Sequence, residues 1–148
     1  MKRLTIMRGL PGSGKSTHIR ENFPGATPFR MAPADWSPVV VSADHFFMNF
    51  FTGDYNFEAS RQGEAHVQAQ LSLIQALESG RSHVIVDNTH VQTWEWQVAA
   101  KLASLFGYTV EVIDVFDGGL SDEALAARNT HKVPAEVIAR MRQKWELA

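Results

Sequence analysis

A glycine-rich segment, Gly9-Leu10-Pro11-Gly12-Ser13-Gly14-Lys15-Ser16-Thr17, matches the pattern G-x-x-x-x-G-K-[ST] at every fixed position. A short apolar run at residues 3–8 precedes it, and a helix is expected from about Ser16. In such a strand–loop–helix unit, glycines let successive backbone N–H groups point at a phosphate, and the positive end of the helix adds to the attraction. The segment therefore predicts a phosphate-binding loop; the alternative is a glycine-rich turn without a ligand.

The chemistry expected of this loop is the binding of a nucleoside triphosphate, with ATP and Mg²⁺ as the cofactors. The Lys15 ammonium would neutralise the β- and γ-phosphate oxygens, and the Ser16 hydroxyl would be a ligand of Mg²⁺. The residues predicted to contact the nucleotide are Gly9, Gly12, Ser13, Gly14, Lys15, Ser16 and Thr17.

Apolar runs alternate with helix-period segments along the whole chain, which is typical of a parallel α/β sheet. Four strands are predicted, at residues 3–8, 39–41, 83–87 and 108–116. Helices are expected from Ser16, over 58–79, 93–106 with Thr93 as its N-cap, 121–128, and from Pro134. The proline-rich residues 23–37 are interpreted as a connection. Because parallel strands need right-handed crossovers, helices should cover both faces. We expect a single three-layer α/β domain over 1–148, a P-loop kinase fold with about four strands and a short lid.

Composition excludes several classes of protein. The chain has no cysteine, so disulfides and thiolate metal sites are excluded. No apolar run approaches the roughly 20 residues of a membrane span, and charges flank the short N-terminal apolar stretch, which argues against a signal peptide. We expect a cytoplasmic protein without a membrane partner. The net charge is −2, but residues 1–30 are basic and residues 31–119 are acidic, so the basic stripe typical of proteins that grip long nucleic acids is not visible.

Two aspartates are placed at the ends of predicted strands. Asp44 follows the second strand and Asp87 closes the third, where ligands of parallel sheets bind. A carboxylate there can accept a proton from an attacking hydroxyl or hold Mg²⁺; the alternative for each is a helix N-cap. We interpret Asp44 as the general base and Asp87 as support for the metal or the acceptor, and the residues alone leave the reverse assignment open.

Arg128 ends the penultimate predicted helix, before a short polar stretch at residues 129–133. A mobile basic segment at this point can close over a triphosphate and stabilise charge in the transition state. The alternative is a solvated arginine that interacts with a helix dipole. Chemistry alone leaves both interpretations open.

An aromatic-rich segment at residues 45–57 follows Asp44 directly. We expect most of its six phenylalanine and tyrosine rings to be core residues and one or two to offer a stacking surface for a nucleobase. His66 is expected in the core. Trp94 and Trp96 cannot share a helix face, so only one of them should be buried.

These motifs resemble, in their order, those of the polynucleotide 5′-kinase family: the loop 9–17, Ser42-Ala43-Asp44, Val86-Asp87-Asn88-Thr89, residues 125–129 and Val133-Pro134. The resemblance covers nearly the whole chain, and it is to the phage-type kinase domain and the NEDD4-binding-protein-2-like kinase domains. It implies that Asp44 activates a 5′-hydroxyl and that Asp87 lies at the acceptor end. By the same resemblance, Lys15 and Ser16 serve ATP and Mg²⁺, and Arg128 is a lid arginine on the transferred phosphoryl group.

The sequence departs from that family at the acceptor side. Phe47 stands where the phage-type kinases are expected to carry an arginine that grips an acceptor phosphate. The predicted function is transfer of the γ-phosphate of ATP to a 5′-hydroxyl of DNA or RNA, with a nucleic acid end or a nucleotide-like molecule as the acceptor. Two alternatives are a kinase of a small molecule, nucleoside or hydroxymethylated DNA base, and a non-catalytic nucleotide-binding module.

Overall fold

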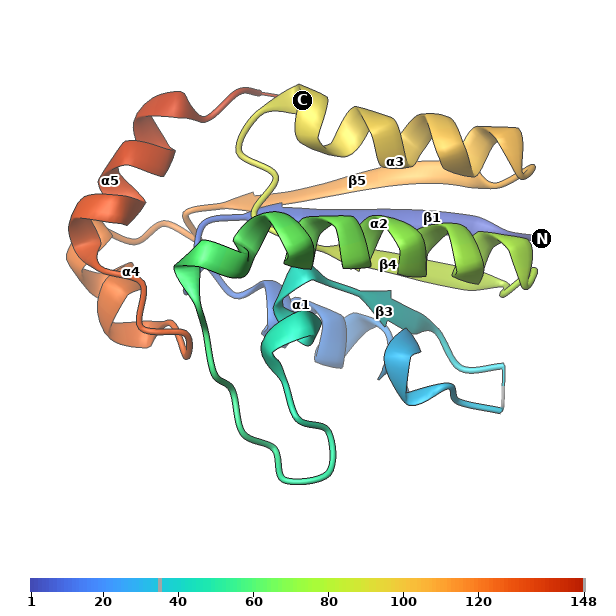
Figure 1. The fold of residues 1–148 in the computed structure, drawn as a ribbon. Coiled ribbons are helices and arrows are strands. Elements are labelled where there is room, and N and C mark those ends of the chain that lie inside the picture. Colours follow the sequence, from blue (N-terminus) through green and yellow to red (C-terminus); the bar gives the residue numbers. More distant parts are fainter. Residues whose placement is uncertain (35, 148) are drawn as a thin grey trace.

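The computed structural model describes residues 1–34 and 36–147, which form a β-sheet with helices on both faces (Figure 1). Five strands lie in the order β2-β3-β4-β1-β5, and every pairing between them is parallel. Their bounds are β1 Arg3–Gly9, β2 Thr27–Pro28, β3 Val39–Val41, β4 His83–Asp87 and β5 Thr109–Phe116. The predicted three-layer α/β fold is confirmed.

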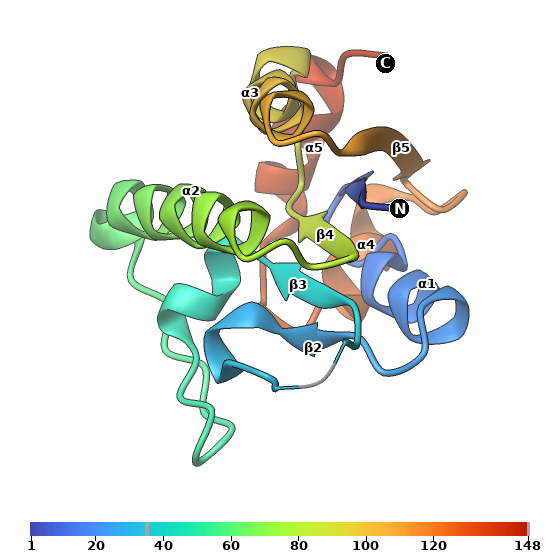
Figure 2. The ribbon, with the colours of Figure 1, turned by 90° about the vertical axis from the view of Figure 1, so that its right-hand side faces the viewer.

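The helices divide between the two faces of the sheet, with α2 and α3 on one side and α1 on the other (Figure 2). Their bounds are α1 Lys15–Asn22, α2 Gln62–Glu78, α3 Thr93–Leu105, α4 Asp122–Arg128 and α5 Ala135–Lys144. Three short 3₁₀ helices join them: η1 Phe29–Met31, η2 Ala43–Phe47 and η3 Ala59–Arg61. None of the helices within the described ranges is long and apolar enough to cross a bilayer.

The two sides of the sheet are packed by alternating residues of the same strands. In β1, Leu4 and Ile6 belong to the cluster beneath α2 and α3, whereas Met7 packs with Ile19 and Phe23 of the α1 side. Because both faces are covered, the central strands are near-continuous apolar runs rather than alternating ones. This is why β1, β3 and β4 could be found from the sequence.

The strand that the sequence did not predict is β2. It lies inside residues 23–37, interpreted as a connection, and pairs with β3 through Thr27 and Pro28. The strand has only two residues, and one of them is a proline, which is tolerated because β2 is the edge strand of the sheet. So short a segment carries no apolar run, and the sheet has five strands where about four were predicted.

Helix boundaries differ from the predictions by a few residues. The helix expected from residue 58 begins at Gln62, after the 3₁₀ turn η3. Thr93 is not the N-cap of α3: Gln92 is, in a capping box with Glu95. Pro134 is likewise the N-cap of α5 rather than a residue of its first turn.

Arg8, at the end of β1, is fully buried and fastens the C-terminal segment to the sheet. It donates hydrogen bonds to the backbone oxygens of His90, Val91 and Glu146 and pairs with Asp114 at 3.1 Å. Its guanidinium lies 4.4 Å from the centre of the Trp145 ring. Burial lowers the pKa of Arg8, and the charge of Asp114 opposes that shift. The strand that leads into the phosphate loop is thereby held from the side of α5.

Candidate active site

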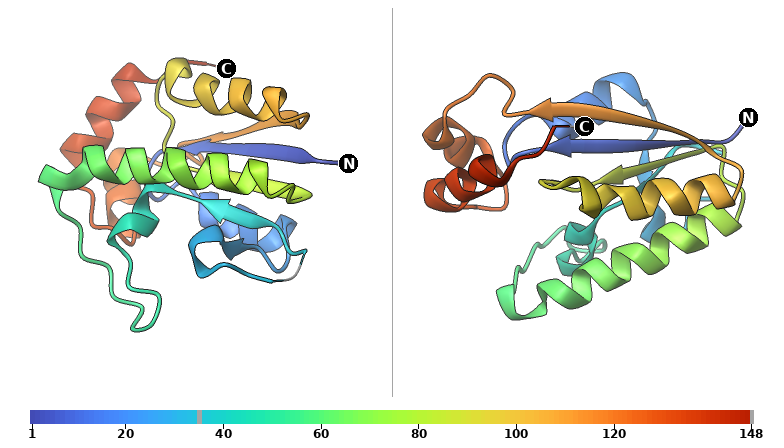
Figure 3. Two further views of the ribbon diagram at one scale, coloured as in Figure 1. Left: turned by 45° about the vertical axis from the view of Figure 1, so that its right-hand side comes forward. Right: turned by 90° about the horizontal axis from the view of Figure 1, so that it is seen from above.

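The glycine-rich loop lies at the carboxyl end of β1, with α4 and α5 beyond the same ends of the strands (Figures 1 and 3). The strand ends at Gly9 and α1 begins at Lys15, so the predicted strand–loop–helix context is present. Gly14 is the N-cap of α1 with φ of 104°, and no side chain in the described part of the protein caps this helix. The first N–H groups of a helix have no acceptor within it, which leaves those of α1 for a ligand.

Close packing fixes the shape of this loop. Gly12 has φ of 81°, and a Cβ atom there would overlap the carbonyl oxygen of Leu125 in α4. A Cβ atom on Gly9 would overlap the Ser13 hydroxyl, so neither glycine tolerates a side chain. Leu10 packs with Leu125 and Ile138 in a small core of its own. The loop is therefore anchored on α4 and α5 as well as on the sheet.

Lys15 is the half-buried cation of the loop. Its Nζ donates to the backbone oxygen of Gly9 at 2.8 Å and to that of Leu10 at 3.4 Å. Burial lowers the pKa of Lys15, whereas the charges of Asp87 and Asp44 raise it. Lys15 and both predicted aspartates thus lie at the carboxyl ends of the inner strands of the sheet.

Asp87 closes β4, and burial raises the pKa of its carboxyl while the Lys15 charge opposes this. Its Oδ1 is buried without a hydrogen-bond partner among the described residues, and so is the Ser13 hydroxyl oxygen. Buried polar atoms without partners are uncommon and costly, so these two mark places for a polar ligand. The predicted alternative, Asp87 as a helix N-cap, is wrong because the next helix is capped by Gln92.

Asp44 lies in η2, just past the end of β3, with its side chain about half exposed. Ser42 is the N-cap of η2 and accepts a hydrogen bond from the Asp44 N–H, so Asp44 itself is not a cap. Asn88 accepts a hydrogen bond from Ala43 N–H at 2.9 Å, and Gly9 N–H donates to the Thr89 carbonyl at 3.2 Å. The run from Asp87 to Thr89 therefore ties the phosphate loop to the segment that carries Asp44.

Two side chains that sequence reasoning missed contact Asp44. The Tyr55 hydroxyl donates to Oδ1 at 3.1 Å, and His131 Nε2 lies 3.4 Å from Oδ2. The rings of Tyr55 and His131 are 4.0 Å apart at an angle of 39°. Tyr55 was only one of six aromatics in its segment, and His131 is 87 positions from Asp44. No spacing rule signals such a contact.

The Asn129 side chain makes four of the hydrogen bonds that hold the segment after α4. Asn129 donates to the carbonyls of Leu125, Ala126 and Val133 and accepts from Val133 N–H. This fixes the loop that brings His131 to Asp44. Arg128 is the last residue of α4, is exposed, and makes no hydrogen bond or ion pair with the rest of the described chain. Its role on the phosphoryl group stays a prediction.

The aromatic segment is less buried than expected. It extends away from the body of the molecule between η2 and η3 (Figures 1 and 3). Phe46 and Phe47 pack against the core, but Phe51 is fully exposed and Phe57 is 46% exposed, so the prediction that most of the rings are core residues is wrong. His66 is exposed, which contradicts its predicted burial. As predicted, Trp94 and Trp96 differ: Trp96 packs against the core and Trp94 is exposed.

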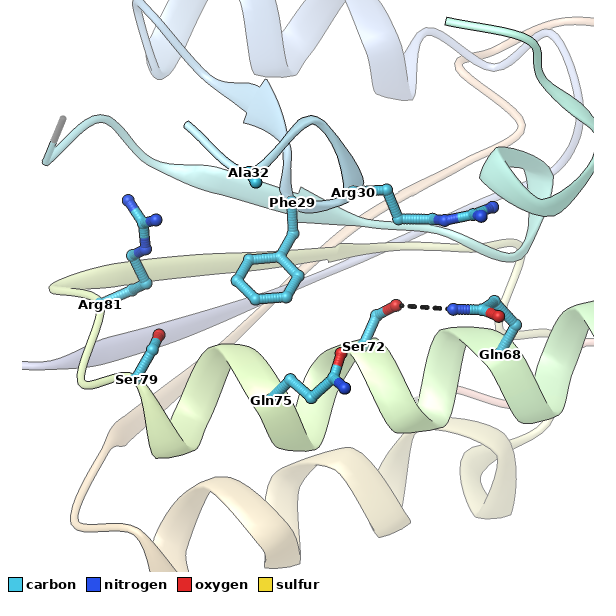
Figure 4. A pocket seen from close by; sticks show the side chains of 8 residues that line it. All are labelled: Phe29, Arg30, Ala32, Gln68, Ser72, Gln75, Ser79 and Arg81. Atoms are coloured by element: carbon cyan, nitrogen blue, oxygen red, sulfur yellow. Dashed lines mark hydrogen bonds between the residues drawn. The ribbon is translucent and has the colours of Figure 1, made fainter. Parts of the chain in front are cut away.

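Two hollows of the surface lie away from these residues. One of about 390 Å³ lies between η1 and α2, and its side chains include Phe29, Arg30 and Arg81 (Figure 4). Another, between α3 and β5, is lined by Lys101 and its neighbours. Neither includes the glycine-rich loop or the two aspartates. The candidate active site lies at the carboxyl ends of β3, β4 and β1, between η2 and α4.

Residues 4–148 match a family model described as an AAA domain. The chain belongs to this family. It is also 33% identical over 144 residues to human NEDD4-binding protein 2, a match that covers 97% of the chain. The predicted resemblance to P-loop kinases of the NEDD4-binding-protein-2 kind is thereby confirmed. The chain spans only 8% of the length of that relative.

Solved structures share the fold. A chain of the Pnkp1/Rnl/Hen1 RNA repair complex is similar with a TM-score of 0.62 and 22% identity, over 97% of this chain and 43% of that one. A putative kinase from Chloroflexus aurantiacus is similar with a TM-score of 0.53 and 21% identity, over 96% of this chain and 68% of that one. These likenesses show that the architecture is that of P-loop kinases.

Proposed function

We propose that this domain transfers the γ-phosphate of ATP to the 5′-hydroxyl of a nucleic acid. The observation that supports this most is the convergence of three groups at the carboxyl ends of the neighbouring strands β3, β4 and β1: Asp44 just past β3, Asp87 at the end of β4 with its Oδ1 unpartnered among the described residues, and the glycine-rich loop with Lys15 after β1. Lys15 there is a cation for phosphates, and Asp44 is a carboxylate for an attacking hydroxyl. A module that only binds a nucleotide needs no such carboxylate.

The residues present fit ATP with Mg²⁺. The amides of the loop and of the first turn of α1, together with Lys15, would hold the β- and γ-phosphates. The exposed Ser16 hydroxyl and the unpartnered Oδ1 of Asp87 are hard oxygen donors of the kind Mg²⁺ prefers. Among the described residues, no group of three or more acidic, histidine or cysteine side chains forms a metal cage. This suits an ion that takes its other ligands from phosphates and water and offsets their charge.

In the proposed reaction, Asp44 orients the acceptor hydroxyl and takes up its proton. Phosphoryl transfer has a loose transition state, so the work of the protein is positioning and charge stabilisation more than proton abstraction. Lys15 would stabilise charge on the transferred group, and Arg128, at the end of α4, would approach it from the lid. Asp87 would hold the metal or the acceptor end.

A second candidate acceptor is a small molecule, a nucleoside or a hydroxymethylated DNA base. The observation that favours it is Phe47, whose ring packs between Phe46, Tyr55 and Phe57. An arginine at this position would grip an acceptor phosphate, whereas Phe47 is uncharged and Arg61, whose guanidinium lies 4.7 Å from the centre of the Phe46 ring, pairs with Glu64.

Consumption of ATP, measured with a panel of acceptors, separates these candidates. The panel consists of a 5′-hydroxyl oligonucleotide, the same oligonucleotide with a 5′-phosphate, a nucleoside, and DNA with hydroxymethylated bases. We expect turnover with the 5′-hydroxyl strand and none with its 5′-phosphorylated twin. Turnover with the nucleoside or the modified DNA alone would assign the second candidate function. Tight ATP binding without turnover on any acceptor would indicate a non-catalytic module.

A further inference from the structure

Both carboxylate oxygens of Asp44 are contacted by side chains from other segments. The Tyr55 hydroxyl donates to Oδ1 at 3.1 Å, and His131 Nε2 lies 3.4 Å from Oδ2. The Asp44 side chain is still 49% exposed, so a ligand can reach it. An acceptor hydroxyl that binds Oδ1 therefore shares this oxygen with Tyr55, and one that binds Oδ2 shares it with His131 or replaces His131 there.

The Tyr55 contact is built into the segment that carries Asp44. Tyr55 forms an antiparallel bridge with Met48, directly after η2, and Asn56 N–H donates to the Phe47 carbonyl at 3.0 Å. The Tyr55 ring also packs on Phe47, with centres 6.1 Å apart. The hydroxyl is thus placed by backbone pairing and ring packing within the segment that carries Asp44.

The chemistry of this contact is fixed as well. Burial raises the pKa of Tyr55, and the negative charge of Asp44 and the hydrogen bond to it raise the pKa further. The phenol therefore stays protonated at neutral pH, donates to the carboxylate, and cannot itself act as the base. A donor held on one carboxylate oxygen sets the plane of the group, and with it the direction of the lone pairs on the other.

The His131 contact is of another kind. It is longer, comes from the loop behind α4, and involves an imidazole that is 35% exposed. Exposed pairs of this sort contribute little free energy, so a ligand can displace them. His131 belongs to the loop that follows α4. Gly12 of the phosphate loop packs against Leu125 of the same helix. Nε2 occupies the position from which an acceptor O–H would donate.

We propose that Tyr55 is a positioning residue for phosphotransfer: its hydroxyl orients Asp44 so that Oδ2 receives the acceptor hydroxyl, which replaces His131 Nε2 there. The inference rests on the function proposed above. In the step itself, the acceptor oxygen forms a bond to the γ-phosphorus and the bond from that phosphorus to the β,γ-bridging oxygen breaks. The acceptor proton goes to Oδ2 of Asp44, and ADP leaves.

The test is a double-mutant cycle of Tyr55→Phe and Asp44→Asn. Tyr55→Phe keeps the ring and its contacts with Phe47 and His131, and removes only the hydroxyl. We expect kcat to fall about tenfold, as for one lost hydrogen bond to a charged group, with KM for ATP and Tm unchanged. In the Asp44→Asn background the same change should have no further effect, because Tyr55 acts through Asp44.

A matched control is Tyr108→Phe, the same change at the only other tyrosine of the chain. The Tyr108 hydroxyl donates to the Arg81 carbonyl at 2.7 Å, at the opposite end of β4. Its removal should lower Tm and leave kcat unchanged. His131→Phe tests the other oxygen: it keeps the ring on Tyr55 and removes the donor, so KM for the acceptor should fall about two- to fivefold.

The inference is overturned if Tyr55→Phe keeps kcat within about twofold of the wild type. An equal loss in the Asp44→Asn background, or a rise in acceptor KM for His131→Phe, also overturns it. Each cycle is measured for transfer to a 5′-hydroxyl strand and for the slow hydrolysis of ATP by water. If only hydrolysis occurs, the proposed function fails, and the cycle on hydrolysis still decides the role of Tyr55. If neither occurs, both the function and the inference are wrong.

Discussion

Lys15 carries the charge of the phosphate loop without packing in the main core. Within the described ranges, its Nζ donates hydrogen bonds to the backbone oxygens of Gly9 and Leu10 and to no side chain. We expect Lys15→Ala to abolish phosphotransfer and to leave the fold intact, because the lost charge-assisted contact to the phosphates contributes roughly 1.5–3 kcal/mol. Steady-state kinetics and circular dichroism check both halves. A Lys15→Ala variant with near-normal turnover would refute the assignment of the loop.

Substitutions of Asp44 and Asp87 are expected to have different effects on the kinetics. Asp44→Asn keeps the shape of the side chain and can still accept from Tyr55, but it cannot take up a proton. We expect kcat to fall by orders of magnitude with little change in KM for ATP, measured with saturating acceptor. If Asp44→Asn is nearly fully active while Asp87→Asn is inactive, the two roles are reversed.

Single functional residues can be predicted from the sequence where a local pattern, such as a motif or the end of a strand, marks them. Lys15 and Ser16 stand at fixed positions of a motif, and Asp44 and Asp87 stand at strand ends, so they could be found without coordinates. Tyr55 and His131 reach Asp44 only because a bridge and a loop bring them back in space. Contacts of that kind depend on tertiary structure and leave no local pattern.

Among the elements, the loop after α4 depends most on a single side chain. Asn129 makes four hydrogen bonds there, at the end of α4 and to Val133. We expect Asn129→Ala to destabilise this loop by about 1–3 kcal/mol and to increase hydrogen exchange at residues 129–133. The matched control is Asn22→Ala, which removes one exposed hydrogen bond to His18. Equal exchange in both variants would show that Asn129 does not hold the loop.

The predictability of the elements follows from how they are stabilised. Buried strands such as β4, and helices with clear start and stop residues such as α4 with its Ser121 cap, were placed closely from the sequence. The strand β2 exists because β3 offers an unpaired edge, and nothing in Thr27–Pro28 itself favours a strand. The start of α2 was misplaced because η3 forms a turn of a different kind before it.

For the molecule as a whole, buried histidines predict loss of stability in acid. Burial lowers the pKa of His83 and of His90 to about 4, below the ordinary 6.5. The unfolded chain therefore binds protons first, and stability falls as pH decreases from about 6.5 to about 4. The slope should be about 1.4 kcal/mol per pH unit for each histidine. Thermal unfolding of His90→Gln should show a shallower slope than the wild type; an unchanged slope would contradict this.

Charge over the whole chain predicts how acceptors bind. Residues 31–119 are acidic and Phe47 replaces a cation, so few acceptor phosphates should be contacted. A protein that contacts several phosphates loses about three or more powers of ten in affinity between about 50 and 200 mM salt. We expect a loss nearer tenfold in kcat/KM, with short and long 5′-hydroxyl strands used about equally. A steep slope with strong dependence on length would reveal an extended basic groove.

The fold and the position of the glycine-rich loop could be predicted from the sequence, because alternating strands and helices and a G-x-x-x-x-G-K-[ST] motif are local patterns. The surroundings of Asp44 could not, because its carboxylate is contacted by side chains from the segment before η3 and from the loop after α4. Those segments are distant in the sequence and are brought together only by the fold.

The most direct test of the proposed function is the fate of the γ-phosphate. The wild type and Asp44→Asn are incubated with γ-labelled ATP and either a 5′-hydroxyl oligonucleotide or the same strand with a 5′-deoxy end. We predict label at the 5′ end of the hydroxyl strand with the wild type, no label on the 5′-deoxy strand, and a rate lower by orders of magnitude with Asp44→Asn. Label that never reaches the hydroxyl strand, or that reaches it equally fast with Asp44→Asn, would contradict the account.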